Sequence, residues 1–114
     1  MKEQLLTFLL QQREELKKEN IYMYLRLMAS GKLYVGFEYC YPYIDWEGKP
    51  KKGCEKRCSL NVSFDELTPQ KYEKFMKSYE RILGEVRESQ KKSKDEFQII
   101  SLEFQGIIKE FEQN

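Results

Sequence analysis

Histidine is absent from this chain of 114 residues. Histidine is the commonest general base near neutral pH and the commonest nitrogen ligand of metals in proteins, so its absence removes the residue on which most such sites depend. The six glycines are scattered and form no phosphate-binding motif. No serine or cysteine has a recognisable base beside it, and the paired carboxylates are doublets typical of solvated helix ends. We therefore predict a protein with no catalytic residues, no enzymatic activity and no cofactor.

Cysteine is scarce as well, with Cys40, Cys54 and Cys58 as its three examples. An odd number of cysteines, in a chain without a secretion signal, predicts free thiols in a reducing compartment. Structural zinc usually takes four ligands, and three thiols without histidine do not supply them. A mixed site that includes Asp45 or Glu55 is the alternative. We predict no metal site, and we expect the cysteines to be buried as small apolar residues.

Long hydrophobic runs are also missing. No apolar segment approaches the roughly 20 residues that a bilayer-spanning helix needs. The apolar stretch near the N-terminus is short and is followed by glutamine and glutamate, not by the small residues of a signal-peptide cleavage site. We expect a cytoplasmic protein that does not enter the membrane.

Charge is nearly balanced, at +1 overall, so no net field attracts the chain to nucleic acid. Its distribution is uneven. Residues 49–57 contain five basic residues and one glutamate, whereas residues 95–114 contain five acidic residues and one lysine. The simplest interpretation is solvated charge, and the alternative is a dipolar molecule whose field steers a partner.

What the chain does have is hydrophobic residues, at 40%, in a length that suits a single domain. Residues 1–20 show helical spacing, residues 21–64 strand alternation with a long basic and aromatic loop over 42–56, and residues 68–112 helical spacing again. The predicted fold is α+β: an N-terminal helix, a three-stranded antiparallel meander, and two C-terminal helices packed on one sheet face. Helix and strand remain open alternatives for 97–104.

The strongest pattern is the alternation over residues 21–41. Odd positions are aliphatic or aromatic, and a three-residue loop that ends at Gly31 pairs odd positions with odd ones. This register places Leu27 opposite Leu33 and Tyr24 opposite Gly36. The second strand should end at Pro42, because proline donates no hydrogen bond to a sheet.

A third strand over 57–64 alternates in the same way. Its predicted inward residues are Cys58, Leu60, Val62 and Phe64, and its predicted outward residues are Arg57, Ser59, Asn61 and Ser63. The polar side of this strand belongs with the even positions of the hairpin, which suggests that this face is open to water.

The even positions of the hairpin predict a surface rich in tyrosine and arginine. Such a surface has three interpretations: a core covered by a helix, a protein interface, or a platform for single-stranded nucleic acid. Trp46, on the predicted loop, either fixes that loop or anchors a partner. The predicted partner-binding residues are Tyr22, Tyr24, Arg26, Tyr34, Tyr43, Trp46, Lys49, Lys51, Lys52 and Arg57.

We therefore expect a small, non-catalytic cytosolic interaction module that regulates a macromolecular partner, most simply a protein. Small inhibitors and adaptors, including those that phages encode, have this character. The alternative is an accessory protein that binds nucleic acid through the same tyrosines and lysines. A homodimer through the N-terminal helix is a further prediction, because the apolar side of that helix is wide.

Overall fold

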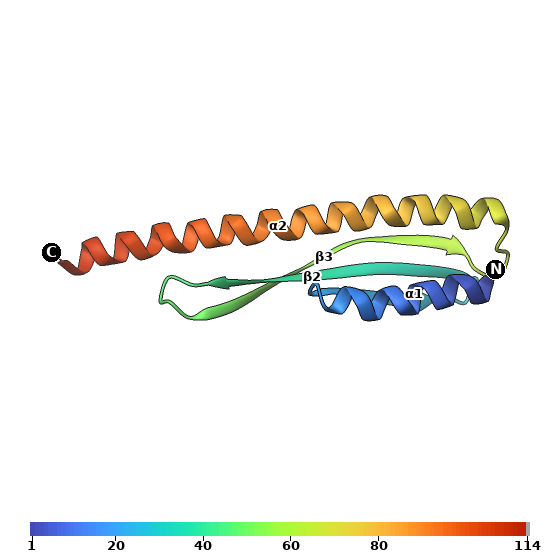
Figure 1. Ribbon diagram of the computed structural model, residues 1–114, viewed down its shortest axis with the longest axis horizontal. Helices are drawn as coiled ribbons and strands as arrows, with labels where there is room; N and C mark the ends of the chain where they lie inside the picture. The colour runs from blue at the N-terminus through green and yellow to red at the C-terminus, as the bar shows by residue number, and fades with distance from the viewer. Residues whose placement is uncertain (114) are drawn as a thin grey trace.

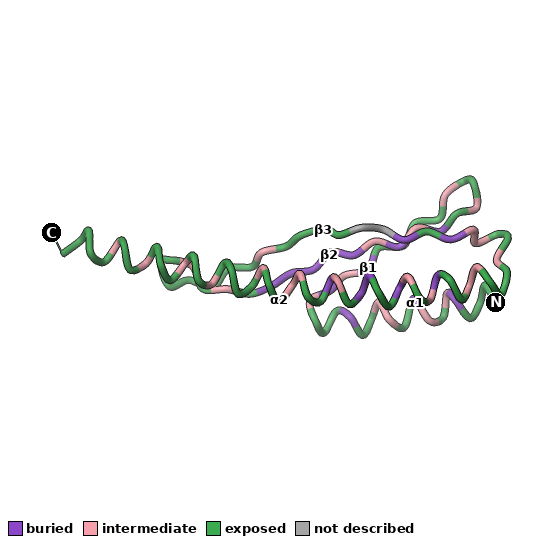
Figure 2. The backbone as a smooth tube through the Cα atoms, turned by 90° about the horizontal axis from the view of Figure 1, so that it is seen from above, coloured by how far each residue is buried: buried purple, intermediate pink, exposed green. Residues whose placement is uncertain are grey.

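A three-stranded antiparallel sheet carries two helices on one of its faces, which confirms the α+β class (Figures 1 and 2). The computed structural model describes residues 1–113, and the side chains of all of these except Cys58 and Ser59. The elements are α1 (Lys2–Lys17), β1 (Ile21–Leu27), β2 (Lys32–Ile44), β3 (Pro50–Ser63) and α2 (Pro69–Gln113). Strand order is β1-β2-β3, and the molecule measures 69 × 23 × 19 Å.

The hairpin register agrees with the prediction at every pair we specified. Leu27 lies opposite Leu33 and Tyr24 opposite Gly36. Gly31 has a φ of 86°, the left-handed conformation that the three-residue loop requires. The alternation of apolar residues and the turn chemistry at Gly31 are therefore enough to predict how β1 pairs with β2.

Strand β2 does not end at Pro42, and this prediction is wrong. The strand continues to Ile44, and β3 begins at Pro50, so residues 45–49 form a short turn in place of the predicted loop over 42–56. The amide of Cys40 donates to the carbonyl of Asn20, which shows that even positions of β2 direct their backbone groups toward β1. Beyond that point β1 is absent, and Pro42 loses no ladder bond there.

A shift in register between Val35 and Phe37 changes which side chains of β3 share a face. Val35 pairs with Leu60, whereas Phe37 pairs with Arg57, so β3 has one additional residue opposite Gly36. Leu60 is buried as predicted. Arg57 shares the face of Phe37, on the helix side, and its predicted outward position is wrong because strict alternation fails across a bulge. The predictions for Cys58 and Ser59 lie outside the described side chains.

The prediction of two C-terminal helices is also wrong, because α2 is one helix of 45 residues. It begins as expected: Pro69 is its first residue, and the Lys71 amide donates to Thr68 Oγ1 at 3.2 Å. The polar segment 87–94, which interrupts the apolar spacing of residues 68–112, contains neither proline nor glycine and consists mostly of good helix formers. Residues 97–104 are helical, which excludes the strand alternative.

The polar segment 87–94 also has specific partners. Arg87 donates two hydrogen bonds of 2.9 Å to the carboxylate of Glu19, just after α1. The side-chain amide of Gln90 donates to the carbonyls of Glu19 and Cys40, at 2.7 and 2.8 Å. This segment therefore joins α2 to the place where α1 ends and β1 begins.

The core lies between the helices and the odd positions of the sheet, with buried residues concentrated away from the C-terminal end of α2 (Figure 2). Leu5, Leu9 and Leu16 of α1 are buried there together with Phe37 and Tyr79. The apolar side of α1 thus packs within its own chain, and a dimer through this helix stays a prediction. Within residues 1–113, no helix combines the length and apolarity needed to cross a bilayer.

Candidate functional site

Within the described residues, no helix covers the face of the sheet opposite α1 and α2, and we call it the open face. Strand pairing places Lys56 beside Glu38 and Lys52 beside Pro42 on this face, next to the even positions of β1. Tyr24 keeps 50% of its surface exposed, so a tyrosine core under a helix is excluded here. The charged and aromatic residues of the open face are Tyr22, Tyr24, Arg26, Lys32, Tyr34, Glu38, Lys52 and Lys56.

Two lysines of β3 lie over two tyrosines of β1. Lys52 Nζ is 5.5 Å from the ring centroid of Tyr22, and Lys56 Nζ is 6.0 Å from that of Tyr24. Both distances are within the range of cation–π attraction. Tyr24 also donates its hydroxyl proton to Glu38 at 3.1 Å, and this hydrogen bond raises the pKa of Tyr24. On the open face, the aromatic rings of Tyr22 and Tyr24 are therefore each paired with a charged side chain.

A disulfide joins Cys40 and Cys54 directly across β2 and β3. The prediction of free thiols is wrong for this pair, and Cys54 is exposed, not buried. The reason is the short turn at 45–49, which brings the two cysteines into register. Since the cytoplasmic location was inferred partly from free thiols, it stays a prediction.

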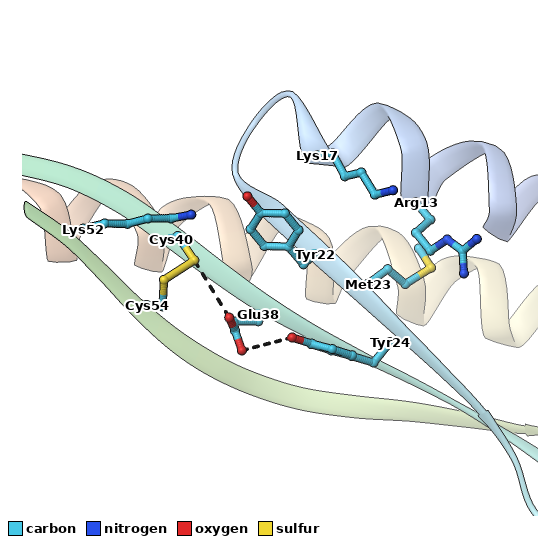
Figure 3. Close-up of a pocket in the computed structure, with 9 residues that line it drawn as sticks. All are labelled: Arg13, Lys17, Tyr22, Met23, Tyr24, Glu38, Cys40, Lys52 and Cys54. Carbon is cyan, nitrogen blue, oxygen red and sulfur yellow. Dashed lines mark hydrogen bonds between the residues drawn. A yellow bond between two sulfur atoms is a disulfide. The ribbon is translucent and has the colours of Figure 1, made fainter.

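Beside the disulfide is a hollow of about 440 Å³, bordered by β1, β2, β3 and α1 (Figure 3). Its lining residues are Arg13, Lys17, Tyr22, Met23, Tyr24, Glu38, Cys40, Lys52 and Cys54. Three of these nine are cationic and one is a carboxylate, so the hollow favours an anionic occupant.

Potential metal ligands also meet at this place. Donor atoms of Glu38, Cys40 and Cys54 lie within 4.8 Å of one another. In the disulfide form neither sulfur is a thiolate, which is the form that binds metal. The carboxylates of the mixed-site alternative lie elsewhere: Asp45 accepts from backbone amides of its own turn, and Glu55 accepts from Tyr39 and Ser93 on the helix side.

The structure divides the predicted site residues into two groups. Tyr22, Tyr24, Arg26, Tyr34 and Lys52 come together on the open face. The second group lies at the hairpin tip or on the helix side, and it consists of Tyr43, Trp46, Lys49, Lys51 and Arg57.

In the second group, aromatic contacts join the hairpin tip to α2. The ring centroids of Tyr43 and Phe97 lie 5.6 Å apart. The ring of Trp46 packs edge-on against that of Phe104, with their centroids 5.3 Å apart. Trp46 therefore fixes the tip to the helix, although 41% of it stays exposed. Lys49 Nζ lies 3.5 Å from Glu47 Oε2, and the two side chains form an ion pair.

Sequence reasoning missed Lys32, Glu38 and Lys56 as members of the site, and it missed the disulfide. Lys32 and Glu38 are even positions of β2 and follow from the alternation of the first hairpin, whereas for Lys56 and the disulfide a signal was present at the turn between β2 and β3. Asp45 accepts from the amides of Glu47 and Lys49, and Gly48 has a φ of 81°. An aspartate three residues before a glycine is typical of a tight turn, and a tight turn here pairs β2 with the basic segment.

Comparisons of this chain with models of protein families, with curated proteins and with solved structures find no match.

Proposed function

We propose that this chain is a non-catalytic binding protein of the inhibitor or adaptor type, and that its open face contacts an acidic surface of a protein partner. The observation that supports this is the composition of an uncovered sheet face. It has three tyrosines, four cationic side chains and one carboxylate. Tyrosine and arginine are enriched at protein interfaces, and a positive surface selects a negative one during association.

A protein partner fits the contacts of this face better than nucleic acid does. The ammonium groups of Lys52 and Lys56 lie over the rings of Tyr22 and Tyr24, so a stacking base has to displace them. Carboxylates of a partner protein pair with the lysines where they are.

Single-stranded nucleic acid is the second candidate. The specific observation in its favour is the alternation of aromatic rings with cations, which is the combination that binds bases by stacking and phosphates by charge. Salt separates the two candidates, because phosphate contacts make affinity fall steeply with ionic strength.

A pull-down with tagged protein from a lysate of cells that carry it, with and without nuclease, tests the proposal. The variants are Lys56→Glu on the open face and, as a control with the same change of charge, Lys77→Glu on the exposed side of α2. We expect a discrete protein that survives nuclease, that the control retains, and that Lys56→Glu loses. Nuclease-sensitive recovery of nucleic acid supports the second candidate. Equal recovery with both variants contradicts a role of the open face.

A further inference from the structure

The C-terminal third of α2 has an apolar stripe that the rest of the described chain covers only in part: Phe97 and Phe104 contact rings of the hairpin, and the other residues of the stripe are more exposed. Large apolar residues follow one another there at alternating steps of three and four: Phe97, Ile100, Phe104, Ile107 and Phe111. This is the spacing of a helix that packs lengthwise against another helix. Ile100, Ile107 and Phe111 are 60%, 59% and 81% exposed. We call these five residues the distal stripe.

The last two residues of the distal stripe, Ile107 and Phe111, are exposed because the hairpin beneath α2 ends before the helix does. The last ring contact of the helix with the sheet is that of Phe104 with Trp46, at the hairpin tip. Residues 105–113 continue past this tip, and no other helix or strand within residues 1–113 lies beside them (Figure 1). A helix end that presents large apolar side chains to water is the surface expected of a docking site.

The exposed area has the size of an interface. Trp46 borders the stripe at the hairpin tip, where it packs against Phe104, and it is partly exposed. At roughly 200 Å² for each large side chain, the exposed parts of these six residues amount to about 650 Å². The largest apolar patch of an ordinary monomer is about 300–600 Å², and a standard interface takes about 800 Å² from each partner.

Charge decides which partner fits. Glu96, Glu103 and Glu110 recur every seven residues and form an acidic row along one border of the distal stripe. In an antiparallel pair of two copies, these glutamates face one another. In a parallel pair, the residues opposite are Ser101 and Ile108, so neither arrangement offers a cation. The row therefore disfavours self-pairing and favours a partner with lysine or arginine in the facing positions.

We propose that the distal stripe binds an amphipathic helix of another protein, one whose apolar side is flanked by lysine or arginine. This site is separate from the open face and has the opposite charge. A chain with both surfaces binds two partners at once, which is the arrangement of an adaptor.

Two synthetic helical peptides test this inference. They share one apolar 3-4 repeat and differ only in their flanking positions, which are lysine in one and glutamate in the other. In fluorescence anisotropy with the full chain, we expect the lysine peptide to bind at least about tenfold more tightly than the glutamate peptide. The double substitution Glu96→Lys and Glu103→Lys should reverse this preference.

Matched variants locate the site. Ile107→Asp on the stripe should abolish binding, whereas Ile99→Asp, which introduces the same charge at an exposed position off the stripe, should not. Circular dichroism verifies that both variants keep their helix. Failure of both peptides to bind overturns the proposal, and so does equal binding of the two.

The oligomeric state gives an independent test. We expect a monomer in sedimentation at micromolar concentration. A dimer that Ile107→Asp dissociates and Ile99→Asp preserves makes a second copy the occupant, and it overturns the proposed partner.

Discussion

The side-chain amide of Gln98 binds both backbone polar groups of Ile44: its Oε1 accepts from the amide at 3.1 Å, and its Nε2 donates to the carbonyl at 3.2 Å. A residue in a neighbouring strand makes the same pair of bonds in a sheet. At this edge of β2, Gln90 binds the Cys40 carbonyl, and Pro42 has no donor. Together these residues close the part of β2 that β1 leaves uncovered, where an open edge invites pairing with another chain.

We expect Gln98→Ala to loosen the hairpin tip from α2. Each lost hydrogen bond contributes about 1 kcal/mol, and the loss should be local because the buried core is elsewhere. The measurement is amide hydrogen exchange at Ile44, which should accelerate. Gln105→Ala, two turns further along the helix, is the control. Unchanged exchange at Ile44 in the Gln98 variant contradicts this account.

Reduction of the Cys40–Cys54 disulfide should destabilise the protein. The bond closes a loop with a sequence separation of 14. Chain-entropy arguments give up to about 3 kcal/mol for a loop of this length. Urea denaturation with and without reductant measures the difference. The double variant Cys40→Ala and Cys54→Ala should match the reduced protein and should not respond to reductant.

The ion pair of Glu19 and Arg87 should make stability depend on pH in the acid range. The hydrogen bond from Arg87 lowers the pKa of Glu19 below its ordinary value of 4.5. A lowered pKa contributes stability that is complete above the unfolded value and is lost as the pH falls through the folded value. Glu19→Gln should therefore be less stable than the parent at pH 7 and equal to it in strong acid. Urea denaturation at several pH values checks this, and a gap that persists in acid contradicts it.

Tyr79 should make stability fall as the pH rises in the alkaline range, whereas the ion pair of Glu19 makes it fall in acid. It is buried between α1 and the sheet and donates to Gln12 Oε1 at 3.0 Å. Burial raises its pKa from 10 to about 12. The folded state holds the phenolic proton of Tyr79 up to a higher pH than the unfolded chain does. The contribution of this group to stability is therefore complete below pH 10 and is lost as the pH rises toward 12.

Two substitutions at this position separate charge from packing. Tyr79→Phe should remove much of the alkaline loss of stability and should cost about 1 kcal/mol at pH 7 for the hydrogen bond to Gln12. Tyr79→Ala should cost about 3–5 kcal/mol, because its ring packs against Phe8, Phe37 and Phe75. Thermal or urea denaturation measures both. An unchanged alkaline slope in Tyr79→Phe contradicts the assignment.

Local patterns predicted local structure well. The β1–β2 register follows from alternation, because a slip by one residue turns every apolar side chain of a strand to the other face. The start of α2 follows from Thr68 and Pro69. The composition of the open face follows from the same alternation, since even positions of β1 are polar or aromatic throughout, but the sequence left open whether a helix covers this face.

The wrong predictions concern features that depend on distant partners. Segment 87–94 is polar because it binds Glu19 and the end of β2, and nothing within the segment indicates this. Pro42 is tolerated in β2 because β1 begins too late to need its amide. The disulfide needed knowledge of the turn, and the bulge near Gly36 has no signature in strict alternation.

The unbroken course of α2 has a mechanical consequence. At about 1.5 Å per residue, its 45 residues form a rod of roughly 67 Å, close to the 69 Å length of the molecule. One end of this rod is embedded in the core, and the other carries the distal stripe. A molecule held at the stripe therefore has a set distance and direction from a molecule on the open face. The helix is therefore a rigid spacer between the two surfaces and not a flexible linker.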